Sequence, residues 1–481
     1  MKTFHILGIV GFLCMMFSLS VIPPILVALW FDDGEAVHFA LSFVMIHAIG
    51  LALWLPTRRS LGDFGRREGF IIVTLFWLVL SLLSAIPFVI GPHLSFVDAF
   101  FEAVSGFTTT GATVVIGLDQ MPPSILYYRG QLQWLGGMGL VVLAVAVMPM
   151  LGIGGMQLYR AEAPGPMKEE KLKPRLTQVA RALWLLYVGL TAACIFFYWI
   201  AGMSVFDAVV HGFATVSTGG FSSHDASLGY FDSPAIDAIA IVFMLAGGIN
   251  FALHYRALAD RSPSPYWRDV EARSFLILIV VALLVIAGML WHLQAYEHPM
   301  DALLDSMFEV VSVITSTGFG TADFSVWPSF LPLLLIFMSF VGGCGGSTAG
   351  GIKVSRVLLL LKQGGQEIHY LIHPHAVRPL RIGTQVLAPR VSQAIWGFFS
   401  AYVVVFALLT LMMMAAGLDQ VSAFSAVATC INNLGPGLGE VATTFAGVSD
   451  AGKLIGILAM LFGRLEIFTV LVILTPAFWR D

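Results

Sequence analysis

Four segments of the chain end in small polar residues followed by glycine, a combination typical of backbone that coordinates a cation. They span residues 98–111, 207–219, 305–318 and 422–435. Glycine permits the backbone angles that turn successive carbonyl oxygens to one side. A ring of such carbonyls can replace the hydration shell of a cation without carrying net charge. The predicted cation-binding residues are Thr110, Gly111, Thr218, Gly219, Thr317, Gly318, Leu434 and Gly435, and the residues predicted to support them are Thr109, Ser217, Ser316 and Asn433.

The four segments share one plan. Each begins with a residue that favours a helix N-cap and continues through about two turns of mostly apolar residues. These first residues are Asp98, Asp207, Asp305 and Ser422, and they precede the glycine by 13, 12, 13 and 13 residues. Repetition at a nearly fixed period is stronger support than any single motif. The pattern predicts four short pore helices that point their negative C-terminal dipole ends toward the glycine loops.

Composition places these loops in a membrane. The chain has 481 residues, of which 58% are hydrophobic and 11% charged, which excludes soluble globular and disordered proteins. Runs without Asp, Glu, Lys or Arg are near or above the length that crosses a bilayer. They are residues 3–31, 36–57, 69–97, 130–159, 182–206, 238–255, 274–296, 324–352 and 391–418, and a tenth apolar stretch, 451–479, is interrupted by Arg464 and Glu466.

Basic residues set the orientation. The loops 93–124, 203–233, 294–327 and 418–448, which carry the glycines, contain no Lys or Arg. The alternate segments contain 20 of the 25 basic residues, so they are expected in the cytoplasm. We therefore expect a multi-pass protein of the inner (plasma) membrane, with both termini cytoplasmic and the glycine loops near the outer face.

These features predict an all-α integral membrane protein with a central pore. A leading helix pair, 1–57, precedes four units of the form span, pore helix, filter loop, span. Each unit begins and ends in the cytoplasm, so the units are parallel and can surround one axis, unlike the inverted repeats of many carriers. The expected units are 58–160, 161–260, 261–370 and 371–481, and their second spans are expected at 125–152, 234–256, 328–361 and 451–478.

The second span of the third unit contains six glycines in ten residues, from Gly342 to Gly351. Each glycine costs a helix interior about 1 kcal/mol relative to alanine, so this run is expected to break the helix. We interpret it as a mobile loop beneath the glycine ring, with close helix packing through small residues as the alternative. The predicted gate residues of this run are Gly342, Gly343, Gly345, Gly346, Ser347, Thr348, Gly350 and Gly351.

Arg464 is the other predicted gate residue. It lies eleven residues after Lys453, which places it about 16 Å further along a helix and deep in the membrane. Its guanidinium can donate to the loop's carbonyls and also oppose a passing cation. The alternative is a structural role, through a salt bridge or hydrogen bonds to the carbonyls of the broken helix, and the two roles are compatible.

Three ionisable residues occupy matching positions in the pore helices, Glu102, His211 and Glu309, with Ala426 in the fourth. They could form an outer ring that attracts cations, or they could bond to helix backbone and neighbouring loops. Both interpretations remain open from sequence.

Enzyme chemistry is not expected. The sequence contains no nucleophile–base constellation, phosphate loop or nucleic-acid-binding patch, and no prosthetic group is implied. The four cysteines show neither a metal spacing nor a disulfide framework, so we expect them to be buried as small hydrophobes.

The glycine loops, together with 133–139, 152–162, 164–166 and 432–437, resemble the Trk/Ktr/HKT potassium transporter superfamily. The leading helix pair and the Tyr-Arg-Ala-Glu sequence at 159–162 resemble its bacterial TrkH branch. The resemblance implies potassium uptake through a channel-like homodimer that contacts membrane lipid, a TrkA-like cytosolic nucleotide-binding regulatory subunit, and no nucleic acid. By position it makes Gly111, Gly219, Gly318 and Gly435 the filter glycines, Gly342–Gly351 the gating loop and Arg464 the cavity arginine. Leu434 departs from the Thr-Gly pattern.

Two alternatives to a potassium channel subunit remain at this stage. One is a proton- or sodium-coupled potassium symporter. The other is a carrier for a different solute, which a carbonyl ring disfavours because organic solutes need a pocket of mixed side chains.

Overall fold

The computed structural model describes residues 3–58, 66–139, 176–375, 379–382, 385–386 and 389–480. The described part is helical apart from one antiparallel pair of two-residue strands, β1 (Arg381–Ile382) and β2 (Gln385–Val386). Among the described residues, six helices are long and apolar enough to cross a membrane, or eight if two bent helix pairs each count as one span. The prediction of an all-α, multi-pass membrane protein is confirmed.

The leading pair consists of an interrupted first span, α1 (Thr3–Ser18), η1 (Leu19–Val21) and α2 (Ile22–Phe31), and of α3 (Ala36–Trp54). The helices cross closely at two glycines. A Cβ added at Gly11 would lie 2.7 Å from the Gly50 oxygen, and one added at Gly50 would lie 2.8 Å from the Gly11 oxygen. Small residues permit such close approach between apolar helices.

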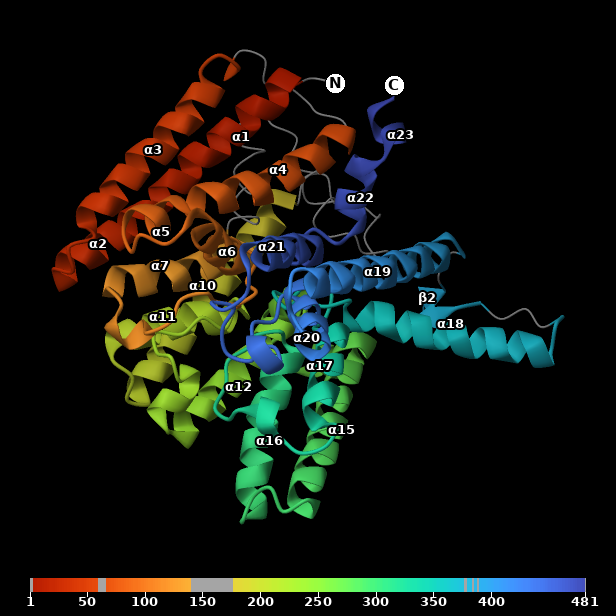
Figure 1. Ribbon diagram of the computed structural model, residues 1–481. Coiled ribbons are helices and arrows are strands. Elements are labelled where there is room, and N and C mark those ends of the chain that lie inside the picture. Colours follow the sequence, from red (N-terminus) through yellow and green to blue (C-terminus); the bar gives the residue numbers. More distant parts are fainter. Residues whose placement is uncertain are drawn as a thin grey trace.

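Each repeat contains a first span, a short pore helix and a second span. The first spans are α4 (Arg66–Ser84) with α5 (Ile86–Ile90), α10 (Leu176–Ile200), α15 (Val270–His292) and α19 (Pro389–Ala415). The pore helices are α6 (Phe96–Phe107), α11 (Val205–Val216), α16 (Pro299–Ile314) and α20 (Gln420–Asn432). Figure 1 shows the repeats following one another around the middle of the molecule, from orange through green and cyan to blue.

The second spans are broken in the second, third and fourth repeats, and in the first repeat the α-helix passes directly into a π-helix. They begin with α7 (Pro123–Trp134), α12 (Pro234–Gly248), α17 (Leu331–Val341) and α21 (Asp450–Arg464). They continue as η4 (Leu135–Gly139), α13 (Phe251–Ala259), α18 (Val354–Ile372) and α22 (Phe468–Leu474). The spans expected at 234–256 and 451–478 are each bent in the middle, where their halves meet at angles of 99° and 109°. The predicted break in the third repeat is confirmed.

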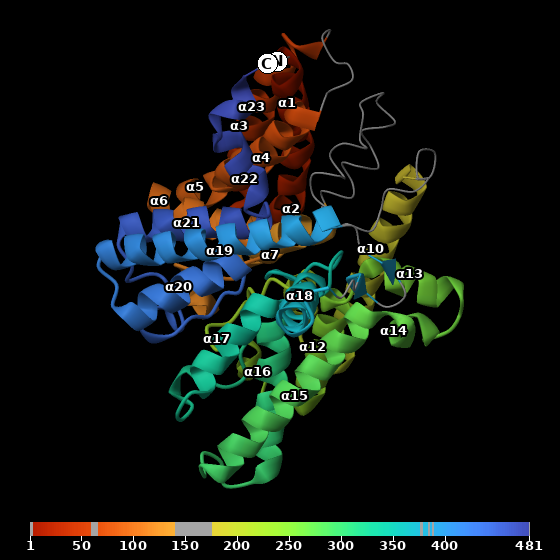
Figure 2. The ribbon, with the colours of Figure 1, turned by 90° about the vertical axis from the view of Figure 1, so that its right-hand side faces the viewer.

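Short helices and turns complete the described chain. They are η3 (Leu118–Gln120), η6 (Ser227–Phe231), α14 (Ser264–Arg268), η7 (Phe324–Val326), η8 (Gly439–Val441) and α23 (Pro476–Trp479). After its break, α18 extends away from most of the molecule beside α19 (Figures 1 and 2).

The predicted N-caps are displaced. In the first two repeats the cap is a serine three residues earlier, since Ser95 and Ser204 accept hydrogen bonds from the Asp98 and Asp207 amides. Each serine hydroxyl also donates to the carboxylate of that aspartate, which lies at the third position of the helix. In the fourth repeat Asp419 caps the helix and Ser422 lies inside it. Asp305 lies well inside α16, which begins at Pro299.

Candidate functional site

The four pore helices end in the same turn, which defines the equivalent residues of the repeats. The backbone amides of Thr110, Gly219, Thr317 and Leu434 each donate a 2.8 Å hydrogen bond to the carbonyl five residues earlier. The preceding residues all adopt left-handed backbone angles, with φ of 57°, 53°, 53° and 53° at Thr109, Thr218, Ser316 and Asn433. The equivalent filter strands are therefore 109–111, 218–220, 316–318 and 433–435.

This register corrects the prediction in the second repeat. Gly220, not Gly219, is the equivalent of Gly111 and Gly318, and it shares their left-handed conformation with φ of 80° against 82° and 82°. Thr218 accordingly takes the supporting position predicted for Ser217. The sequence contained a signal for this shift, because the distance from Asp207 to Gly220 is 13 residues, as in the other three repeats.

The strands form a closed ring in chain order. A Cβ added at each glycine would meet the next strand. Gly111 adjoins the Gly219 carbonyl, and Gly220 adjoins the Thr317 carbonyl. A Cβ at Gly318 would lie 3.0 Å from the Gly435 amide, and one at Gly435 would lie 2.6 Å from the Gly111 oxygen. Four strands with adjacent carbonyls are the geometry that cation coordination by backbone requires.

Side-chain hydroxyls brace the strands. Thr110 Oγ1 lies 2.7 Å from Thr108 Oγ1, and Thr317 Oγ1 lies 2.7 Å from Thr315 Oγ1. Asn433 donates from Nδ2 to Thr110 Oγ1 at 3.0 Å, which links the fourth strand to the first. These hydrogen bonds hold the strand side chains in place and connect the fourth strand to the first.

The ionisable pore-helix residues hold the chain that follows each strand. Glu102 accepts hydrogen bonds from the Val114 amide and Thr113 Oγ1, and Glu309 accepts from the Thr321 and Ala322 amides. His211 Nε2 lies 2.9 Å from Ser222 Oγ. All three side chains are buried. Their contacts fit the second of the two interpretations from sequence, bonding to neighbouring loops.

In the fourth repeat, where the matching position is Ala426, two serines hold the chain that follows the strand. Ser425 accepts from the Leu438 amide at 2.9 Å, and Ser422 accepts from the Glu440 amide at 2.9 Å. Each pore helix is therefore fastened to its own ascending chain by a different set of donors and acceptors.

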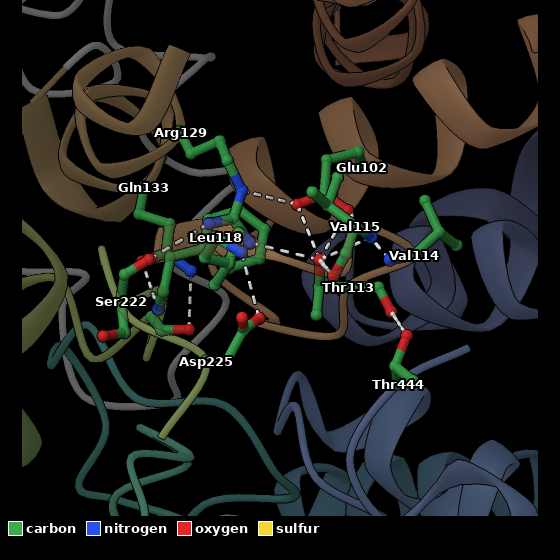
Figure 3. Close-up of polar contacts among 12 residues, drawn as sticks. Glu102, Thr113, Val114, Val115, Leu118, Arg129, Gln133, Ser222, Asp225 and Thr444 are labelled. Atoms are coloured by element: carbon green, nitrogen blue, oxygen red, sulfur yellow. Dashed lines mark hydrogen bonds and ion pairs between the residues drawn. The ribbon is translucent and has the colours of Figure 1, made fainter. Parts of the chain in front are cut away.

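Arg129 on α7 is a site residue that the sequence interpretation missed. It donates from Nε to Glu102 Oε1 at 2.7 Å, from Nη2 to Thr113 Oγ1 at 3.1 Å and from Nη1 to the Ser222 carbonyl at 3.1 Å (Figure 3). Its guanidinium also lies 4.2 Å from the centre of the Phe221 ring. Only 1% of the side chain is exposed. An arginine on the otherwise basic-poor side, four residues before the glycine-rich motif 133–139, was the available signal.

Acidic residues join loops of the first two repeats on the side that the sequence predicts to face outward. Asp225 Oδ1 accepts from the Gly117 and Leu118 amides, each at 3.1 Å. His224 Nδ1 lies 2.5 Å from Asp119 Oδ1. This bond lowers the pKa of the Asp119 carboxyl below its ordinary value, because it favours the ionised form.

The glycine-rich run lies directly against the filter strands. The Gly350 amide donates to Ser316 Oγ at 2.5 Å, and Thr348 Oγ1 donates to the Gly247 carbonyl at 3.0 Å. The Gly345 amide is held by Glu271 Oε1 at 2.7 Å. The run is an irregular loop that replaces the middle of a span, in agreement with the prediction.

Arg464 ends α21 and reaches this loop. Its Nη1 donates to the Thr348 carbonyl at 3.2 Å, and its Nη2 donates to the Gly136 and Gly137 carbonyls at 2.5 and 2.7 Å. The predicted contact between Arg464 and loop carbonyls is confirmed. A second cation lies nearby, since Lys353 Nζ donates to the Ala349 carbonyl of the same loop. Glu466 pairs with Arg356 at 2.5 Å.

The remaining predicted features are the cysteines, a possible metal site and two motifs of the first repeat. All four cysteines are buried and free, as expected. Among the described residues, no group of three or more His, Cys, Asp or Glu side chains could hold a metal ion. The motifs at 152–162 and 164–166 lie outside the described residues.

The Glu102–Arg129 pair gives a stability prediction. Replacing Arg129 by Leu leaves a buried carboxylate without its cation, and we expect a loss of about 3–5 kcal/mol of unfolding free energy. Thermal unfolding of the purified protein in detergent measures the loss. Arg129→Leu combined with Glu102→Gln removes the orphan charge and should recover part of it. Arg273→Leu, at an exposed arginine of α15, is the matched control. Equal melting temperatures for Arg129→Leu and this control would contradict the role of the pair.

The comparisons with known proteins agree with this architecture. The family model TrkH, described as a cation transport protein, matches residues 36–480. The chain is 52% identical over 480 residues to the Trk system potassium uptake protein TrkH of Vibrio parahaemolyticus, covering 99% of both chains. It is 50% identical over 475 residues to the protein of the same name from Escherichia coli, covering 98% of both.

A solved structure matches over the full length. The crystal structure of the potassium transporter TrkH from Vibrio parahaemolyticus has a TM-score of 0.91 and 49% sequence identity, with 100% of both chains covered. The chain therefore belongs to the TrkH family of cation transport proteins, which are transporters rather than enzymes.

Proposed function

We propose that this chain takes up potassium ions through a channel-like pore in the inner membrane, with both termini in the cytoplasm. The closed ring of four equivalent glycine strands carries the proposal, because backbone strands of one register that meet in a ring are what carbonyl coordination of a cation requires. The names of the relatives, Trk system potassium uptake proteins, support potassium as the ion. The potassium ion is the transported substrate and is coordinated by residues 109–111, 218–220, 316–318 and 433–435.

Growth of a strain that lacks its own potassium uptake, at low external potassium, tests this function. Flux of labelled potassium into proteoliposomes, with and without a proton or sodium gradient, separates a channel from a symporter. Failure of the unmodified chain to support growth or flux, when it is folded and inserted, would overturn the proposal.

A substitution at Gly220 tests the proposed filter directly. We expect Gly220→Ala to reduce potassium uptake at least about tenfold, because a Cβ there would collide with the Thr317 carbonyl in a conformation that side chains rarely adopt. Gly288→Ala, on α15, is the matched control, since a Cβ there would meet no atom within 4 Å. Uptake is measured in the same growth and flux assays. Normal uptake and ion preference in Gly220→Ala would remove Gly220 from the filter.

We also propose that the glycine-rich loop and Arg464 gate the pore below the ring. The loop's contact with Ser316 and the reach of Arg464 to the Thr348 carbonyl support this proposal. Two basic side chains, Arg464 and Lys353, donate to carbonyls of this loop, and their charges would repel a cation strongly in a low-dielectric passage. Opening the gate would move the loop aside together with α18, which follows it directly.

Arg464→Ala should therefore raise basal potassium flux several-fold while leaving ion preference unchanged. Arg464→Lys retains the charge but loses the planar fork, so we expect an intermediate flux. Deleting Gly345 and Gly346 should act in the same direction, because the Gly345 amide and the Gly346 carbonyl fasten the loop to Glu271 and Phe251. The measurement is proteoliposome flux, or single-channel recording. If all three variants conduct no more than the parent, the gate lies elsewhere.

We propose, finally, that the chain works as a homodimer with a cytosolic nucleotide-binding regulatory subunit. The basic segments expected in the cytoplasm support the docking of such a partner. The exposed apolar residues of α18 support further contacts there, and they are Leu361, Ile368, Leu371 and Ile372. Affinity purification from native membranes should recover both a second copy and a regulatory protein. Nucleotide-sensitive flux from the purified chain alone, as a monomer, would contradict this proposal.

A further inference from the structure

The second filter strand differs from the others at its middle position. Thr110, Thr317 and Leu434 carry buried side chains there, whereas the second strand has Gly219. A side chain at Gly219 has no room. An added Cβ would lie 2.6 Å from Oε1 and 2.8 Å from Nε2 of Gln133, closer than real Cβ contacts come. The carboxamide of Gln133 therefore occupies the place that a strand side chain fills in the other three repeats.

Gln133 also makes the polar contacts that hold the strand. Its Nε2 donates to the Gly219 carbonyl at 2.6 Å, and its Oε1 accepts from the Phe221 amide at 3.0 Å. These bonds lie on either side of Gly220, the residue whose left-handed conformation turns the strand. Among the ring residues of the described chain, Gly219 is the one whose carbonyl accepts a side-chain hydrogen bond.

The chemistry of the position requires an amide. A carboxamide offers a donor and an acceptor on one small planar group, so it can serve a carbonyl and an amide together. A carboxylate would lose the donor, and an aliphatic side chain would lose both contacts. Each loss would leave a buried backbone group without its partner.

Helix α7 holds Gln133 rigidly in this place. The side chain is fully buried. One turn earlier on the same helix, Arg129 donates to the Ser222 carbonyl of the same ascending chain, and Figure 3 shows both side chains reaching that chain. The next residue, Trp134, stacks on Tyr187 and donates from Nε1 to Thr191.

We propose that Gln133 is a positioning residue for ion selection. Its carboxamide replaces the missing side chain of the second filter strand and fixes the peptide planes around Gly220. The proposal rests on the proposed potassium pore. Because it acts through the strand and not on the ion, its loss should change discrimination between cations more than it changes the stability of the fold.

Three variants test the pairing of Gln133 with Gly219. Gln133→Ala removes both hydrogen bonds, and Gly219→Thr introduces a side chain that collides with the carboxamide. We expect each to lower the potassium-to-sodium flux ratio in proteoliposomes about tenfold, the factor that corresponds to one net hydrogen bond. In the double variant the threonine enters the vacated space and restores the pattern of the first and third strands. Its flux ratio should return to within about threefold of the parent.

The matched control is Gln131→Ala. Gln131 is a buried glutamine on the same helix, and its Nε2 donates to the Ser20 carbonyl at 2.7 Å, in the leading helix pair and away from the ring. This variant should lose stability without losing selectivity. Melting temperatures in detergent separate the two effects, and Gln133→Glu, which keeps the shape but loses the donor, serves if Gln133→Ala fails to fold.

The outcomes separate a failure of the proposed potassium pore from a failure of the proposed role of Gln133. If the parent conducts no potassium, the proposed function fails. If the parent conducts and selects potassium, but Gln133→Ala and Gln133→Glu keep the parent's flux ratio, the positioning role is overturned. A double variant no better than the worse single variant would overturn the substitution of the carboxamide for the strand side chain.

Discussion

A peptide carbonyl inside a bilayer needs a hydrogen-bond donor, a water molecule or an ion as its partner, because hydrocarbon chains cannot form hydrogen bonds. A pore lined by backbone must therefore first leave one set of carbonyls free to bind the ion. Second, every other polar group near these carbonyls needs a hydrogen-bond partner on the side away from the pore. In the proposed pore, the strands that meet the first demand are residues 109–111, 218–220, 316–318 and 433–435. The second is met by Glu102, His211, Glu309 and Ser425, each of which holds the chain that rises from its own strand.

The same constraint explains the broken second spans. Each break leaves carbonyls without helical partners, and these carbonyls become acceptors for other repeats. Arg464 donates hydrogen bonds to the Gly136 and Gly137 carbonyls. Amides of the glycine-rich loop donate to the Gly247 and Gly248 carbonyls. These irregular segments of the second spans connect the repeats through hydrogen bonds for which continuous helices would have had no free groups.

Much of this architecture could be predicted from the sequence, because charge-free runs and a repeated helix-glycine pattern are local signals. The register of the second strand is signalled in the sequence by the 13-residue distance from Asp207 to Gly220, although Gly219 and Gly220 are adjacent and either fits a glycine motif. In the structure Gly220 takes the left-handed conformation, and Gly219 contacts Gln133, which is 86 positions away in sequence. The breaks at Gly248 and Arg464 and the role of Arg129 likewise depend on partners from other repeats, which hydropathy does not reveal.

Because one chain supplies all four strands, the ring is free of the symmetry that identical subunits impose. A substitution in a homotetrameric pore alters every quadrant at once, whereas here it alters a single quadrant and leaves three intact. The four fastenings have diverged accordingly into a carboxylate with an arginine, an imidazole, a carboxylate bound to amides, and a pair of serines. Evolution can therefore adjust the width and stiffness of such a ring one strand at a time, through residues that lie outside the strands.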